Sequence, residues 1–154
     1  FIGNFKRRNS KIDFNIIIMT KIVTHYIGDL KTEAEHIQSG SKLITDAPID
    51  NNGKGEKFSP TDLFATSLGS CMLTIMGIAA NTHNFDIKGT RIETQKVKAA
   101  NPRRVAELIL DIYLPRNDYS EKEMRFIESA IKSCPVANSL HPDIIKTINY
   151  HFPQ

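Results

Sequence analysis

Residues 59–81 read SPTDLFATSLGSCMLTIMGIAAN, and this stretch predicts the element around which the rest of the chain is organised. Ser59 is suited to cap a helix, Pro60 suits the first helical position, and Asp62 lies three residues after the cap. Residues 63–80 carry no charged side chain, and apolar residues fall on nearly every face. We therefore predict a long helix that is buried on nearly all sides.

An uncharged stretch of this length also meets the length criterion for a membrane span. Against that interpretation, no basic cluster follows it to set an orientation, and long polar-rich segments flank it on both sides. Small and hydroxylated residues dilute it further, namely Thr66, Ser67, Gly69, Ser70 and Thr74. We favour the central helix of a soluble domain, and a membrane-anchored protein is a distant alternative.

The composition limits the class of protein. A chain of 154 residues favours one domain with a real hydrophobic core. Two cysteines are too few for a secreted disulfide framework, so we expect a reducing compartment, the cytoplasm. The net charge of +3 arises entirely in residues 1–18, and the remainder is balanced, which argues against a nucleic-acid partner.

Residues 1–18 look different from the rest. The sequence begins at Phe1, and Met19 opens a segment that resembles a natural start. The leader is basic and has only a short apolar patch at residues 14–19, without the apolar region and cleavage site of a signal peptide. We interpret residues 1–18 as an artefact of expression or start-site assignment, and residues 19–154 as a single domain.

The segments around the central helix alternate between strand and helix signals. Capping residues 120–123 (SEKE) predict a helix to residue 132, and residues 133–140 predict a short helical turn before Pro142. Alternation within residues 105–114 predicts a buried set of Val105, Leu108, Leu110, Ile112 and Leu114. The other strands are predicted at residues 21–28, 33–38, 42–46, 87–98 and 144–152, with turns at 39–40 and 101–104. This order indicates an α+β fold with antiparallel sheets.

The two cysteines are the candidate chemical groups. If Pro135 is the first residue of a helix, Cys134 lies at its N-cap, where backbone N–H groups favour the thiolate. Cys71 lies inside the apolar helix, and taken alone it is more typical of an inert packed thiol. Together they form a candidate pair of attacking and resolving thiols that cycles through sulfenic acid and disulfide.

Other chemistries find less support. The five histidines show no ligand spacing, and two cysteines without a CxxC motif do not favour zinc. A Cys–His–Asn hydrolase remains an alternative, but no nucleophile signature surrounds Cys71. We expect neither a metal nor a cofactor.

Two cysteine-bearing motifs carry a family resemblance. Residues 55–71 read GEKFSPTDLFATSLGSC and residues 134–140 read CPVANSL. With these motifs and this order of elements, the chain resembles the OsmC/Ohr family, the osmotically inducible protein C and organic hydroperoxide resistance proteins, in its general OsmC-like branch. The resemblance covers residues 21–152.

The resemblance implies an intertwined homodimer in which antiparallel sheets wrap around two buried central helices. It implies an interface site in which Cys71 attacks an organic hydroperoxide, Cys134 resolves the sulfenic acid, and a small or protein-bound dithiol regenerates the enzyme. The expected role is a thiol-dependent peroxidase in oxidative stress defence. The alternative is a non-catalytic module that binds a small apolar ligand at the dimer interface.

The chain departs from the peroxidase branches at two positions. Those branches hold the thiolate with an arginine paired to a glutamate, but no arginine occurs here between Arg8 and Arg91. Lys54 or Lys57 is the candidate substitute, although lysine lacks the bidentate fork of arginine. At the glutamate position the candidates are Thr61 and Asp62, and Asp62 fits the acidic pattern of many OsmC-like proteins.

Overall fold

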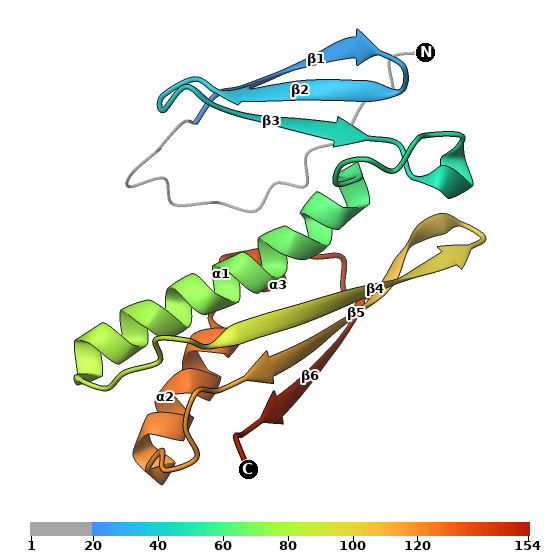
Figure 1. The fold of residues 1–154 in the computed structure, drawn as a ribbon. Coiled ribbons are helices and arrows are strands. Elements are labelled where there is room, and N and C mark those ends of the chain that lie inside the picture. Colours follow the sequence, from blue (N-terminus) through green and yellow to red (C-terminus); the bar gives the residue numbers. More distant parts are fainter. Residues whose placement is uncertain (1–19) are drawn as a thin grey trace, which may run out of the picture. The chain divides into compact units, whose positions relative to one another are not determined.

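A computed structural model describes residues 20–154, which fall into two compact units, residues up to Ile44 and Thr45–Gln154 (Figure 1). The predicted leader at residues 1–18 and the start at Met19 lie outside the described residues. The assignment of residues 19–154 to one domain stays a prediction.

The first unit is a three-stranded sheet with the strand order β1-β2-β3 (Figure 1). Its strands are β1 (Ile22–Gly28), β2 (Lys31–His36) and β3 (Ser41–Asp46), the last of which runs into the second unit. Strands β1 and β2 are antiparallel. The predicted turn before β3 is confirmed, because the N–H groups of Ser39 and Gly40 both donate to the His36 carbonyl and Gly40 has φ +69°. This hairpin therefore follows from local turn chemistry.

The second unit contains a three-stranded sheet with the strand order β4-β5-β6. Strands β4 (Arg91–Ala100) and β5 (Arg103–Tyr113) form the predicted antiparallel hairpin. Strand β6 (Ile145–His151) pairs with β5 in parallel, so the expectation of purely antiparallel sheets is wrong here. The reason is the connection, because the chain crosses over through two helices before it returns to the sheet.

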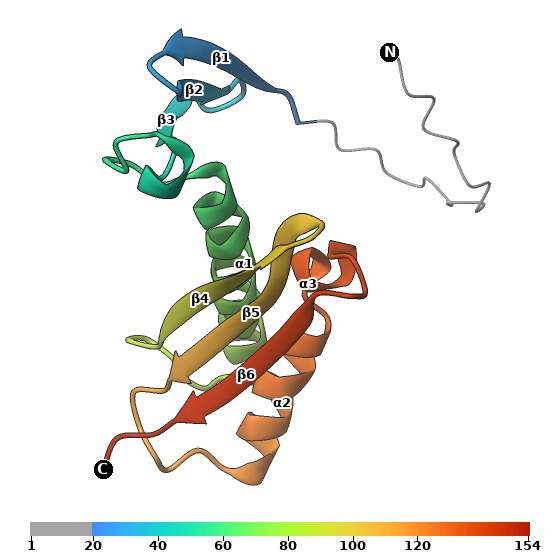
Figure 2. The same ribbon diagram turned by 90° about the vertical axis from the view of Figure 1, so that its right-hand side faces the viewer.

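Three α-helices and one 3-10 turn complete this unit. They are η1 (Ile49–Asn51), α1 (Pro60–His83), α2 (Glu121–Lys132) and α3 (Pro135–Ser139). Figure 2 shows α1 and α2 on the same face of the sheet. The predicted inward residues of β5 are all confirmed as buried, with Leu108, Leu110 and Ile112 at 0% exposure. They form one core with the buried side of α1 and with Ile127 and Ile131 of α2.

Helix α1 begins as predicted. Ser59 and Asp62 form a reciprocal capping box, and Asn84 ends the helix in a left-handed conformation. The prediction of burial on nearly all sides is not met within one chain: Leu68, Met72 and Met76 are buried, whereas Ile78 is 59% exposed. The sheet and α2 can cover only part of the circumference of a helix. Within residues 20–154, α1 is also the one helix that is long and apolar enough to cross a membrane, a test that core helices of soluble proteins also pass.

Candidate functional site

The two cysteines lie together although 63 positions separate them in the sequence. The Sγ atoms of Cys71 on α1 and Cys134 at the start of α3 are 3.0 Å apart. Both are free thiols. The separation exceeds the roughly 2.05 Å of a disulfide bond, so the pair is unbonded but within reach of bond formation. The fold therefore places two thiols in direct contact.

Their exposure differs. Cys134 is 0% exposed within the core cluster, whereas Cys71 is partly exposed at the edge of the same cluster. Of the two cysteines, Cys71 is therefore the residue with surface open to solvent in the described chain. Within residues 20–154, the only hydrogen-bond partner of the Cys71 Sγ is the Cys134 Sγ.

The local sequence explains the position of Cys134. Helix α2 ends at Lys132, Pro135 opens α3, and Cys134 is the N-cap whose Sγ accepts a hydrogen bond from the Ala137 N–H at 3.5 Å. The predicted N-cap position is thus confirmed. The predicted effect on the thiolate is corrected, because burial raises the pKa of Cys134 and outweighs the bonds from the backbone N–H groups.

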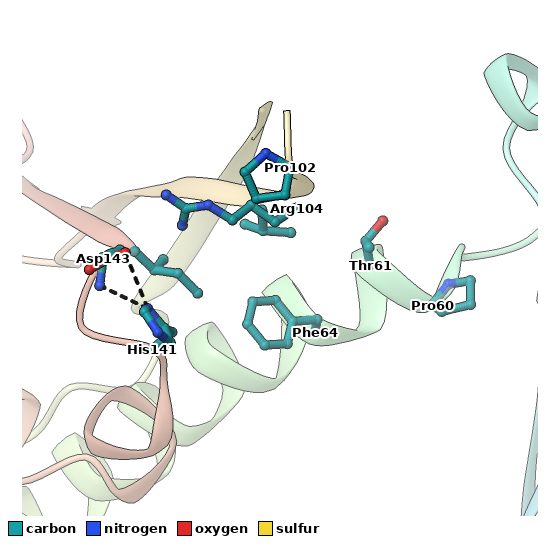
Figure 3. A pocket seen from close by; sticks show the side chains of 9 residues that line it. Pro60, Thr61, Phe64, Pro102, Arg104, His141 and Asp143 are labelled. Carbon is teal, nitrogen blue, oxygen red and sulfur yellow. Dashed lines mark hydrogen bonds and ion pairs between the residues drawn. The ribbon is translucent and has the colours of Figure 1, made fainter. Parts of the chain in front are cut away.

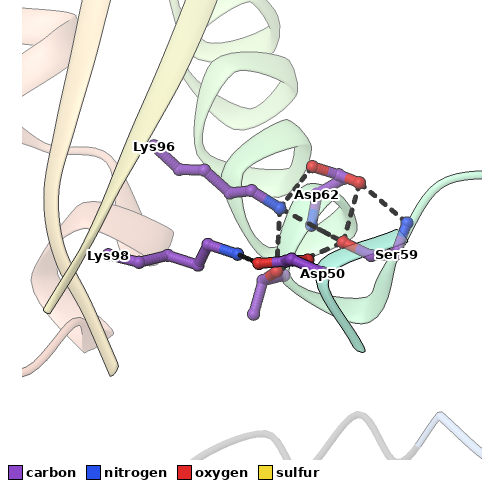
Figure 4. A network of polar contacts seen from close by, with 6 residues as sticks. Asp50, Ser59, Asp62, Lys96 and Lys98 are labelled. Atoms are coloured by element: carbon purple, nitrogen blue, oxygen red, sulfur yellow. Dashed lines mark hydrogen bonds and ion pairs between the residues drawn. The ribbon is translucent and has the colours of Figure 1, made fainter. Parts of the chain in front are cut away.

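A second polar cluster lies at the start of α1 (Figure 4). Lys96 of β4 contacts the Asp62 carboxylate at 2.5 Å and donates to the hydroxyls of Ser59 and Thr61. Partial burial by itself would raise the pKa of Asp62, but the hydrogen bonds from Lys96 and Ser59 outweigh it and hold the pKa at about 2. Asp62 is therefore a carboxylate at neutral pH and is committed to the helix cap and to Lys96.

The structure does not bring the predicted charged residues to the thiols within one chain. Asp62 precedes Cys71 by nine residues, which places it about half a turn around α1 and roughly 14 Å along its axis. Lys54 and Lys57 are exposed in the loop before α1, and the described part of the chain provides neither with a hydrogen bond or ion pair. Their roles at the site stay predictions.

Sequence reasoning missed Lys96 as the partner of Asp62. The alternation of residues along β4 could have indicated it. Ile92, Thr94 and Lys96 are two positions apart and share the partly buried face of β4, so Lys96 lies on the side that faces α1. A lysine on an inward-facing strand position needs a partner. Because 34 positions separate Lys96 from Asp62 in the sequence, no local pattern identifies Asp62 as the partner of this lysine.

A largely apolar cavity of about 700 Å³ lies between the start of α1, the start of β5 and the segment that leads into β6 (Figure 3). Phe64 contributes to its wall. It precedes Cys71 by seven residues, so the two side chains share one face of α1 and lie roughly 10 Å apart along its axis. The volume is within the range of small-molecule sites, about 300–1,000 Å³.

Comparisons with known proteins identify relatives. A family model described as OsmC-like protein matches residues 53–148. A protein of Psychrobacter arcticus, whose name proposes a role in the osmotic stress and detoxification response, has a crystal structure that is 48% identical. That structure covers 91% of this chain and 100% of its own, with a TM-score of 0.79.

Two more distant relatives extend the comparison. An organic hydroperoxide resistance protein OsmC of Legionella pneumophila is 17% identical over 88% of this chain and 98% of its own, with a TM-score of 0.70, which shows the shared fold alone. An uncharacterized protein of Methanocaldococcus jannaschii is 27% identical over 101 residues, which are 62% of this chain and 53% of that protein. The chain thus spans about half the length of this curated relative. From the family match, the cysteine-bearing helix and the likeness to the Psychrobacter structure, we conclude that the chain belongs to the OsmC-like protein family.

Proposed function

We propose that this protein is a thiol-dependent peroxidase that reduces organic hydroperoxides in oxidative stress defence. The observation that carries the proposal is the contact of 3.0 Å between the sulfur atoms of Cys71 and Cys134. Two thiols brought together from distant parts of a chain can form and break a disulfide without a rearrangement of the fold. The name of the Legionella relative supports the choice of organic hydroperoxides.

The reaction has three balanced steps. The Cys71 thiolate attacks one oxygen of the hydroperoxide, the O–O bond breaks, and an alcohol leaves after its alkoxide takes up a proton. Cys71 is then a sulfenic acid. The Cys134 thiol loses its proton and attacks the Cys71 sulfur, which forms the disulfide and releases water. A small or protein-bound dithiol reduces this disulfide to two thiols and becomes a disulfide itself.

Exposure supports this division of roles. Cys71 is partly exposed and accessible to a substrate, whereas Cys134 is fully buried and reaches only Cys71. Burial raises the pKa of Cys134 and so disfavours its thiolate, which makes Cys134 the poorer choice for the first attack. Cys134 needs to ionise only when a sulfenic acid stands beside it.

The proposal includes a homodimer in the cytoplasm. Much of the surface of α1 remains exposed although residues 63–80 carry no charged side chain. A second copy of the chain is the simplest partner that would bury this surface. The three-stranded first unit likewise exposes large apolar side chains, including Ile22, Tyr26 and Leu43. The cation that stabilises the thiolate then has to come from this assembly; Lys54 and Lys57 are the candidates, with Asp62 as the acid that could hold such a lysine.

A rapid thiol count tests the proposal. The reduced protein is mixed with one equivalent of cumene hydroperoxide, and free thiols are counted within seconds, with hydrogen peroxide as a comparison. We expect both thiols to disappear faster with cumene hydroperoxide, a Cys71–Cys134 disulfide by mass spectrometry, and recovery with a dithiol. Two thiols that survive for minutes would overturn the proposal.

Serine variants of the two cysteines separate the attacking role from the resolving role. Cys71→Ser should abolish dithiol-driven turnover, and Cys134→Ser should accumulate a sulfenic acid on Cys71 that dimedone traps. Ser70→Ala is the matched control, because it changes an exposed neighbour on the same helix and removes no thiol. Unchanged turnover in Cys71→Ser would exclude Cys71 as the attacking group.

The cavity supports a second candidate, a module that binds a small ligand without catalysis. It has a ligand-sized volume and a mostly apolar wall, and it does not depend on the thiols. A ligand that co-purifies with the protein, found by native mass spectrometry together with an absence of turnover, would favour this candidate. Fast turnover by a ligand-free protein would exclude it.

A further inference from the structure

Two neighbouring cavities of contrasting character meet at the tip of the β4–β5 hairpin. The larger is the apolar cavity of about 700 Å³ described above. The smaller, of about 290 Å³, includes the side chains of Lys98, Arg103 and Arg104 in its wall. Both cavities share Pro60, Thr61, Arg104 and Val105, so one continuous surface passes from apolar to basic.

The charges on this surface are not balanced. Lys98 is paired with Asp50, and Arg103 contacts the uncharged amide of Asn51 while also interacting electrostatically with the Asp50 carboxylate. Arg104 has no hydrogen-bond or ion-pair partner among residues 20–154. Among residues 20–154, Arg104 is therefore the guanidinium group on this surface that lacks a carboxylate partner.

The opposite wall of the larger cavity contains one carboxylate, Asp143. Its Oδ2 lies 3.7 Å from His141 Nδ1, and that ring nitrogen accepts a hydrogen bond from the Asp143 backbone N–H at 3.2 Å. Figure 3 shows Arg104 extending from the hairpin along the cavity toward the side where these two residues lie. Asp143 nonetheless forms no ion pair with Arg104, so the arginine remains available to a ligand.

The two arginines differ in which cavities they line. Arg104 contributes to both cavities, whereas Arg103 contributes only to the smaller one. Among the basic side chains on this surface, Arg104 is thus the one that lines both the apolar and the basic cavity.

We propose that the two cavities form one binding site for a single-chain amphiphile with an anionic head. The hydrocarbon chain lies in the apolar cavity, and a carboxylate or phosphate head binds Arg104, with Arg103 as a second donor. Guanidinium groups are suited to this role because their planar donors match both heads bidentately. The site gives a ligand class to the second candidate function, and it does not depend on the thiol chemistry.

The head group is expected to decide the affinity. A neutral alcohol of equal chain length buries the same apolar surface but leaves Arg104 without a counter-charge. We expect dodecanoate to bind the reduced protein at least tenfold more tightly than 1-dodecanol, which corresponds to about 1.4 kcal/mol. Dodecyl phosphate distinguishes a phosphate head from a carboxylate head.

Isothermal titration calorimetry below the micellar concentration of each ligand tests the site. Arg104→Gln should weaken dodecanoate binding about tenfold and leave dodecanol binding unchanged. Arg125→Gln is the matched control, because Arg125 is exposed on α2 with an ion pair to Glu121 and lies in neither cavity. Cys71→Ser should bind like the wild type, which separates this inference from the peroxidase proposal.

Three results would overturn the inference. Equal affinity for dodecanoate and dodecanol would show that the anionic head does not contribute to binding. Unchanged dodecanoate binding in Arg104→Gln would show that Arg104 does not bind the head. An absence of binding to all three ligands would show that the cavity is closed in the assembled protein, for example by a second copy of the chain.

Discussion

Oxidation of the thiol pair should stabilise the protein by an amount that follows from the loop it closes. A Cys71–Cys134 disulfide links residues 63 positions apart. Closing a loop of this length removes conformational entropy from the unfolded chain and is worth about 4 kcal/mol. The sulfur atoms are already in contact in the folded chain, so we expect little opposing strain and a measured gain of about 2–4 kcal/mol.

Urea unfolding of the reduced and the oxidised protein measures this gain. With a slope of about 2 kcal/mol/M, a gain of 4 kcal/mol moves the midpoint up by roughly 2 M. The two forms must be compared at one protein concentration, because dimerisation would also change the apparent stability. Cys134→Ser is the control, since oxidant should not raise its midpoint.

Two outcomes would refute this reasoning. A disulfide between chains, seen on a non-reducing gel, would mean that the thiols of one chain do not meet in solution. An intramolecular disulfide with an unchanged or lower midpoint would mean that bond formation distorts the junction of α1 and α3 enough to offset the loop entropy.

The remaining predictions concern the α1 surface, its start and the preceding loop. Ile78→Glu should leave the folded chain intact, because Ile78 is 59% exposed, yet it should convert a dimer to monomers in analytical ultracentrifugation; a dimer that persists would exclude this face as the interface. The pKa of Asp62 is about 2 against an ordinary value of 3.8, so its ion pair contributes stability that is complete above about pH 4 and is lost as the pH falls toward 2. Melting temperatures of Lys96→Gln should therefore fall less steeply than those of the wild type over this range, and identical slopes would contradict the assignment. Gly53→Ala should destabilise the protein by about 2 kcal/mol in urea unfolding, because an added Cβ would lie 1.7 Å from the Ala47 carbonyl oxygen, whereas a neutral result would mean that the loop shifts freely.

Local signals predicted most elements because each depends on a few neighbouring residues. The Ser59 cap with Pro60 located the start of α1, and Pro135 placed Cys134 at an N-cap. Alternation in β5 identified its buried face. The cysteine motifs led to the family that the comparisons then showed. These features involve backbone geometry within a turn or two, which sequence patterns encode directly.

Other features depend on pairings between distant parts of the chain. The parallel pairing of β6 with β5 follows from a crossover whose direction no local pattern records. The partner of Asp62 proved to be Lys96 of β4, and the lysines close to it in sequence, Lys54 and Lys57, point to solvent. Charge partners are chosen by where strands and helices pack, which is a tertiary property.

The amino-acid pattern was enough to predict an α+β chain of the OsmC/Ohr type with a long apolar helix and two candidate thiols. The contact between Cys71 and Cys134, the raised pKa of Cys134 and the place of Arg104 between an apolar and a basic cavity emerged from the folded chain alone. Capping and alternation act over a few residues, whereas contact, desolvation and cavity shape arise only when separate elements pack into one core.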